Sequence, residues 1–146
     1  MKWLFILMAF GAGMVLPVQA GINSRLGGEM GGPVIAAFLS FGVGTLVLIL
    51  WILALRIPMP LAAGVSQTQW WYWIGGALGA YFVAAVTMLA PHLGAAALVA
   101  LILAGQMAAS LLLDQFGLLG YPVIPFDFKR LAGAVLLVAG VLLIRK

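Results

Sequence analysis

The sequence predicts an all-α fold, a polytopic membrane protein with five transmembrane helices. Of its 146 residues, 66% are hydrophobic and only 7% are charged, and the mean hydropathy is +1.25. Soluble domains carry roughly 45–50% apolar and about 25% charged residues. The apolar residues form continuous runs rather than the alternating pattern of membrane-spanning strands. Too few ionisable groups remain to cover a water-soluble surface, which argues against a soluble enzyme, a nucleic-acid-binding domain and a disordered chain.

Five apolar stretches are long enough, or nearly long enough, to cross a membrane. A spanning helix needs about 20 residues, because each residue adds about 1.5 Å and the hydrocarbon core is about 30 Å thick. The predicted spans cover about residues 3–22, 33–55, 71–89, 92–113 and 128–144, in one transmembrane domain over residues 1–146. A polar loop is predicted at residues 23–28. Pro91 is predicted to form the tight turn between the third and fourth spans.

The first span carries two amides on one helix face. Gln19 and Asn23 are four residues apart, so they lie one turn above the other. Polar groups in hydrocarbon cost free energy unless they are paired. These amides therefore either bind a solute or join helices by hydrogen bonds, and the sequence leaves both interpretations open.

Hydroxyl groups occur in the second and third spans. Ser40, Thr45 and Thr87 are interpreted as helix contacts, because such hydroxyls can bond a backbone carbonyl of the preceding turn. Tyr81 in the third span is a candidate for one wall of a solute site.

The fourth span carries a polar stripe that runs toward its end. Gln106, Ser110 and Asp114 are spaced at i, i+4 and i+8, which places them on one face. Asp114 is the only acid that adjoins a core span, so it is the candidate for proton coupling, with a solvated helix-end residue as the alternative. Asp127 is interpreted as local charge balance for the two cations that follow it.

The cations are almost evenly divided between the two sides of the membrane. With five spans, one side holds Lys2, Arg56, Lys129 and Arg130, and the other holds Arg25, Arg145 and Lys146. Orientation is normally set by an excess of Lys and Arg on the cytoplasmic side, and four against three is almost no excess. Either the chain has one fixed topology, or it inserts both ways and pairs as an antiparallel homodimer.

Motifs for catalysis and for metal or cofactor binding are missing from the sequence. There is no cysteine, no metalloprotease or hydrolase motif and no phosphate-binding loop. The cations are dispersed and form no basic patch for nucleic acid. We therefore expect no enzyme activity, no cofactor, no metal and no nucleic-acid partner. The expected partners are the lipid bilayer, a small-molecule substrate and a second copy of the chain.

Two motifs carry a resemblance to a known family. They read Pro17-x-Gln19-Ala20-Gly21-Ile22-Asn23-Ser24-x-Leu26-Gly27 and Gly105-Gln106-x-x-x-Ser110-Leu111-x-x-Asp114-Gln115-Phe116-Gly117. With Pro91-His92-Leu93-Gly94 and the glycine-containing C-terminal helix, they resemble a family of half-size bacterial inner-membrane proteins of unknown function. That family lies within the drug/metabolite transporter superfamily and is distantly similar to small multidrug resistance proteins.

The resemblance implies a five-helix half-transporter that works as a homodimer. It is akin to ten-helix members of the superfamily in which two inverted halves are fused. It also implies a dimer seam at Gly133 and Gly140 of the last helix. Small multidrug resistance proteins carry a buried glutamate in their first helix, whereas this chain has only Gln19 there. The difference favours an uncharged or zwitterionic substrate.

These observations together predict a transporter of a small polar metabolite, a multi-pass protein of the bacterial inner membrane. Its expected substrate site lies near the midplane, with Gln19 and Asn23 facing Gln106 and Ser110 across the helices, and with Tyr81 nearby. Two alternatives stay open at this point. One is a structural or regulatory membrane subunit that transports nothing, and the other is a proton-coupled cation or drug exporter.

Overall fold

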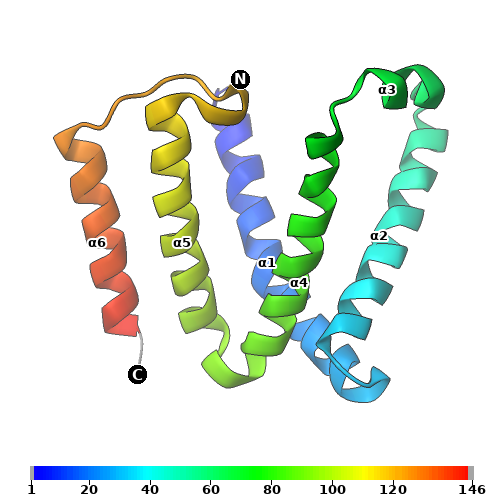
Figure 1. The fold of residues 1–146 in the computed structure, drawn as a ribbon. Coiled ribbons are helices and arrows are strands. Elements are labelled where there is room, and N and C mark those ends of the chain that lie inside the picture. The colour runs from blue at the N-terminus through cyan, green and yellow to red at the C-terminus, as the bar shows by residue number, and fades with distance from the viewer. Residues whose placement is uncertain (1, 145–146) are drawn as a thin grey trace. The chain divides into compact units, whose positions relative to one another are not determined.

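The computed structural model describes residues 2–144, apart from the side chains of residues 62 and 63, so Arg145 and Lys146 of the charge count lie outside it. All regular elements in this part of the chain are helical (Figure 1). They are α1 (Lys2–Met30), α2 (Pro33–Ala54), α3 (Leu61–Gln67), η1 (Trp70–Trp73), α4 (Ile74–Leu93), α5 (Ala95–Phe116), η2 (Leu118–Gly120) and α6 (Phe128–Ile144). The all-α prediction is confirmed for these residues.

Within the described residues, four helical segments are long and apolar enough to cross a membrane. They are α1, α2, the continuous segment Trp70–Leu93 and α5. With 17 residues, α6 is about 25 Å long, which is less than the thickness of the hydrocarbon core. The chain is therefore a membrane protein, and its fifth span remains a prediction.

The chain divides into two compact units, Met1–His92 and Leu93–Lys146. The first contains α1 to α4, and the second contains α5, η2 and α6. The single transmembrane domain over residues 1–146 stays a prediction.

In the first unit, α1 is longer than the sequence predicted. The expected loop at residues 23–28 is wrong, because these residues continue the helix to Met30. The chain reverses instead at Gly31 and Gly32, whose φ angles are +89° and +134°. Glycine adopts such angles without steric cost, and Pro33 then begins α2 with its fixed φ. The helix thus runs through the polar segment to the first residues that can turn.

Helices α1 and α2 pack closely beside this turn. The N–H of Gly32 donates to the carbonyl of Gly27 at 2.8 Å. A Cβ atom on Gly27 would lie 3.3 Å from the Gly32 backbone and 3.5 Å from the Cβ of Ala36. Ala20, Gly27, Ala36 and Ala37 are buried. Small residues therefore allow the two backbones to approach, as is common between membrane helices.

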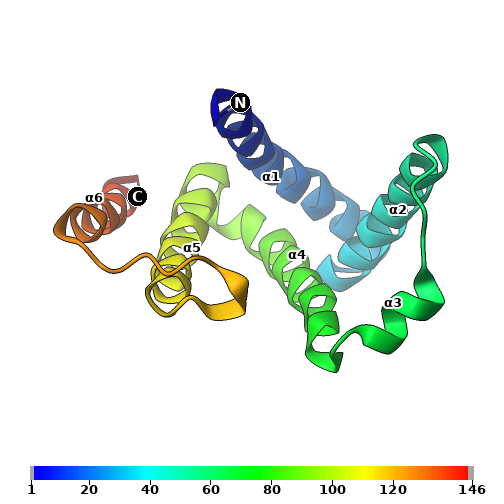
Figure 2. The ribbon, with the colours of Figure 1, turned by 90° about the horizontal axis from the view of Figure 1, so that it is seen from above.

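Helix α4 also contacts α2 within the first unit. The Phe41 ring lies 3.5 Å from the position of a Cβ on Gly79. Between the two helices the chain passes through the short helices α3 and η1, at the end of the unit away from the α1–α2 turn (Figures 1 and 2).

The reversal after α4 is also displaced from its predicted position. Pro91 lies inside the last turn of α4, and the turn is made by Gly94, with φ +72°. The prediction that Pro91 forms the turn is wrong, because its φ is fixed near −65° and it continues the helix, whereas the break between α4 and α5 has a positive φ at Gly94. The third and fourth predicted spans, 71–89 and 92–113, accordingly become α4 at 74–93 and α5 at 95–116.

In the second unit, α5 and α6 pack against each other. Helix α5 ends at Gly117, which adopts a left-handed conformation with φ +59°. Residues 118–127 then lead to α6, whose bounds coincide with the predicted residues 128–144.

Large apolar side chains point outward from the helices of both units. Phe5, Leu50 and Leu143 are 62%, 66% and 86% exposed. Apolar surface on this scale is unfavourable in water and favourable against lipid tails.

Candidate functional site

The amide pair of α1 is partly enclosed by the α1–α2 contact. Gln19 is half-buried, whereas Asn23 is only 4% exposed and lies between the buried residues Ala20 and Gly27. The Nδ2 group of Asn23 finds no hydrogen-bond partner among the residues that the structure describes. A buried donor without a partner costs about 1–3 kcal/mol. This site therefore contains a donor that the helix packing does not satisfy.

Thr87 of α4 is a second buried polar group of the first unit. It is 3% exposed, and its Oγ1 has no hydrogen-bond partner in the described part of the chain. The interpretation that this hydroxyl bonds the preceding turn is therefore wrong. From the sequence, Thr87 was weighed as a site residue and the helix contact was favoured, although the hydroxyl stands within the apolar stretch 82–90.

Asn23 and Thr87 occupy comparable positions on their helices. Each lies about two turns before the end of its helix, at Met30 and Leu93 respectively. In Figure 1, α1 and α4 run in the same direction. Both polar groups thus lie in the half of the first unit that contains the α1–α2 turn.

The other predicted solute contacts are accessible in the structure. Tyr81 is 75% exposed on α4, and Gln106 and Ser110 are exposed on α5. Gln106 and Ser110 belong to the second unit, whereas Gln19 and Asn23 belong to the first. That these two pairs face one another therefore stays a prediction.

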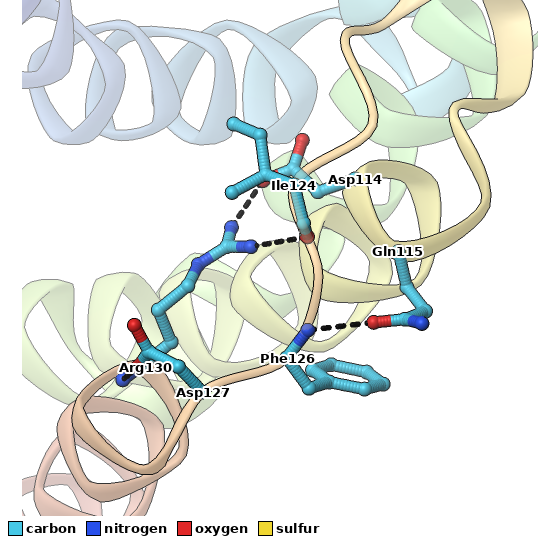
Figure 3. Close-up of polar contacts among 6 residues, drawn as sticks. All are labelled: Asp114, Gln115, Ile124, Phe126, Asp127 and Arg130. Carbon is cyan, nitrogen blue, oxygen red and sulfur yellow. Dashed lines mark hydrogen bonds and ion pairs between the residues drawn. The ribbon is translucent and has the colours of Figure 1, made fainter.

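Asp114 has a defined partner within the second unit. Its carboxylate forms an ion pair with the guanidinium of Arg130, at the start of α6 (Figure 3). The second guanidinium nitrogen, Nη1, donates to the carbonyl of Ile124 at 2.8 Å. Both side chains are partly buried, with 19% of Asp114 and 26% of Arg130 exposed. From the sequence, Asp114 was a candidate for proton coupling, with a solvated helix-end residue as the alternative, and neither interpretation included this ion pair.

Further hydrogen bonds hold the connecting loop to the end of α5 (Figure 3). The N–H of Ile124 donates to the backbone carbonyl of Asp114 at 2.8 Å, and the N–H of Phe126 donates to Oε1 of Gln115 at 2.6 Å. We call Asp114, Gln115, Ile124, Phe126 and Arg130 the polar clasp. The polar clasp could not be predicted from sequence, because Gln115 and the two loop residues belong to no recognisable motif.

Asp127 has a role different from the predicted one. Its Oδ1 accepts the backbone N–H of Arg130 at 2.7 Å, which caps the first turn of α6. The carboxylate that pairs with the Arg130 side chain is Asp114 instead. Asp127 is therefore a helix cap rather than a partner in a side-chain ion pair.

The predicted dimer seam lies on an open part of α6. Neither Gly133 nor Gly140 would bring a Cβ within 4 Å of another group in the structure.

Across residues 2–144, no three His, Cys, Asp or Glu side chains gather in a group that could hold a metal ion.

Comparison with known proteins gives two findings. The model of a family described as "Putative inner membrane exporter, YdcZ" matches residues 4–143. The inner membrane protein YdcZ of Escherichia coli (strain K12) is 38% identical over 82 residues, which cover 56% of this chain and 54% of that protein. The match thus spans about half the length of this curated relative. No solved structure matches the chain.

Proposed function

The chain belongs to the family described as "Putative inner membrane exporter, YdcZ", and from this premise we propose that it carries a small polar metabolite across the bacterial inner membrane. The observation that carries the proposal is the pair of unsatisfied buried groups, Asn23 Nδ2 and Thr87 Oγ1. Unpaired polar groups destabilise a membrane interior, and the described helices supply no hydrogen-bond partner for either group. A solute with hydrogen-bond acceptors would satisfy both while it is bound.

The charges support an uncharged or zwitterionic substrate. A lone organic cation in a membrane interior needs a carboxylate as counter-ion. Between residues 3 and 113 the only acid is Glu29, which is exposed near the end of α1. Asp114 is already paired with Arg130. Both facts weigh against a proton-coupled cation or drug exporter.

The proposed site centres on Asn23 and Thr87, with the half-buried Gln19 one turn from Asn23. Gln106, Ser110 and Tyr81 are proposed to contribute from their exposed positions. Amides and hydroxyls bind neutral solutes by short directional hydrogen bonds, and each contributes most where water is excluded.

We further propose that α6 is a fifth span and that two copies work together. With five spans the Lys and Arg residues divide four to three between the two sides, so neither orientation is strongly favoured. The copies would then pair as an antiparallel homodimer, with Gly133 and Gly140 at the seam. Close approach at small residues is the usual way in which membrane helices associate.

Export from cells tests the proposed function. Cells that lack related exporters would express the chain, and mass spectrometry would quantify polar solutes in the medium. We expect at least one neutral or zwitterionic solute to accumulate with the wild type and to fall to background with Asn23→Leu. Gln106→Leu should show the same loss if Gln106 contributes.

The control for this experiment is Ser24→Ala, a half-buried neighbour on another face of α1. It should retain export, and all variants should reach the membrane in equal amounts. Export that survives Asn23→Leu would contradict the proposed site. A medium unchanged by the wild type would favour a subunit that transports nothing.

A further inference from the structure

The polar clasp surrounds a cation that lies close to the start of α6. Arg130 is the third residue of this helix, and only 14 helical residues follow it up to Ile144. Those residues are about 21 Å long, which is about two thirds of the hydrocarbon thickness. If α6 crosses the membrane, Arg130 must therefore lie at the hydrocarbon boundary or within it.

A guanidinium at this depth needs a counter-ion and hydrogen-bond acceptors. The polar clasp supplies both. Asp114 of α5 forms an ion pair with Nη2 of Arg130, and the Ile124 carbonyl accepts a hydrogen bond from Nη1 at 2.8 Å. The neighbouring cation Lys129 is exposed and has no ion-pair partner among the described residues. The pairing is thus specific to Arg130.

The backbone of the loop is satisfied at the same place. The N–H groups of Ile124 and Phe126 donate to the Asp114 carbonyl and the Gln115 side chain. Near the hydrocarbon, irregular backbone is stable only where such groups are paired within the protein. Gly117 allows the chain to fold back on α5, since its φ of +59° is in the left-handed region.

We infer that Asp114 is the fixed counter-ion that lets Arg130, and with it the short helix α6, enter the membrane beside α5. This assigns to Asp114 a positioning role in the insertion of α6 instead of proton coupling. The inference rests on the proposed fifth span, and it does not depend on what the protein transports.

The chain contains no cysteine, so a single cysteine can report on the position of α6. We choose Leu136→Cys, at the middle of α6, where the side chain is 72% exposed within the single chain, so that only the bilayer or a second copy beside an inserted α6 would shield the thiol. Maleimides react with the hydrated thiolate, hence slowly with a thiol inside the bilayer. The labelling rate would be measured in membranes for this variant alone and with changes in the clasp.

The expected order of labelling rates follows from the charge that each change leaves behind. Asp114→Asn leaves Arg130 without a counter-ion and should raise the rate at least about fivefold. Arg130→Gln removes the buried charge itself and should raise the rate much less. The double variant should return close to the rate of Leu136→Cys alone. Lys129→Gln, the matched loss of a neighbouring cation, should have no effect.

The outcomes distinguish a failure of the proposed role of Asp114 from a failure of the proposed fifth span. Rapid labelling of Leu136→Cys alone would contradict the fifth span. Slow labelling that Asp114→Asn does not change would leave the span intact and overturn the role of Asp114. Rapid labelling of both Asp114→Asn and the double variant would also overturn it, because the defect would then not depend on the charge of Arg130.

Discussion

Replacing Thr87 by valine tests whether its hydroxyl binds a solute or joins helices. Valine has nearly the same shape as threonine and similar helix propensity, so the change removes the hydroxyl and little else. Thr87 is 3% exposed, and its Oγ1 has no partner in the described residues. We therefore expect Thr87→Val to increase the free energy of unfolding while it impairs transport.

The magnitude follows from the cost of burying an unsatisfied hydroxyl. Mutational data place this cost at roughly 1–3 kcal/mol, and the added methyl group removes it. We expect a gain of about 1–2 kcal/mol, measured by denaturant titration of the purified protein in mild detergent. Thr45→Val, the same change at an exposed position of α2, should alter stability by no more than about 0.5 kcal/mol.

The sign of the stability change on Thr87→Val shows whether the hydroxyl joins helices in the folded protein. A loss of about 1 kcal/mol on Thr87→Val would mean that the hydroxyl is bonded in the folded protein and holds helices together. A gain in stability without any loss of transport would remove Thr87 from the proposed site.

Three further predictions concern packing and caps. Gly27→Ala should destabilise the protein by about 1–2 kcal/mol in denaturant titration, because its Cβ would lie 3.3 Å from the α1–α2 turn. The neighbouring Gly28→Ala, with nothing within 4 Å, should instead stabilise by about 0.5–1 kcal/mol, and equal effects would contradict the packing. Gly117→Ala should cost about 2–3 kcal/mol in the same assay, because of its φ of +59° and a Cβ contact of 2.7 Å with Val123, and an unchanged midpoint would refute the described turn. Asp127→Ala should cost about 1 kcal/mol and Asp127→Asn much less, since asparagine also caps helices, so equal losses would argue against the cap.

The helices were predictable from sequence because each apolar run is long and continuous. A continuous apolar run of about 20 residues has few alternatives to a helix in a membrane. The ends of the helices were less predictable. The polar segment at residues 23–28 looked like a loop, but a helix there satisfies its backbone groups locally, and the turn requires the positive φ angles of Gly31 and Gly32. The prediction of a turn at Pro91 failed for a similar reason, because Pro91 continues α4 and the positive φ angle occurs at Gly94.

The candidate site shows what sequence spacing can and cannot provide. The i, i+4 spacing placed Gln19 and Asn23 on one face, but it could not show that Asn23 is the more buried of the two. The Asp114–Arg130 pair joins residues 16 positions apart across a loop, and no local pattern indicates it. Thr87 was assigned to the preceding turn because that is the common behaviour of hydroxyls in helices, and only the structure shows that its Oγ1 lacks a partner among residues 2–144.

Solute release from proteoliposomes tests most directly whether the chain transports a neutral or zwitterionic solute through a site that contains Asn23. Vesicles containing the purified chain would be loaded with an equimolar mixture of neutral polyols, zwitterionic amino acids and a lipophilic cation, and the loss of each would be followed by mass spectrometry. We expect that a neutral or zwitterionic solute leaves faster than from empty vesicles, that Asn23→Leu abolishes this release, and that the cation stays at its background rate. Release of the cation alone, or equal release by the wild type and Asn23→Leu, would contradict this expectation.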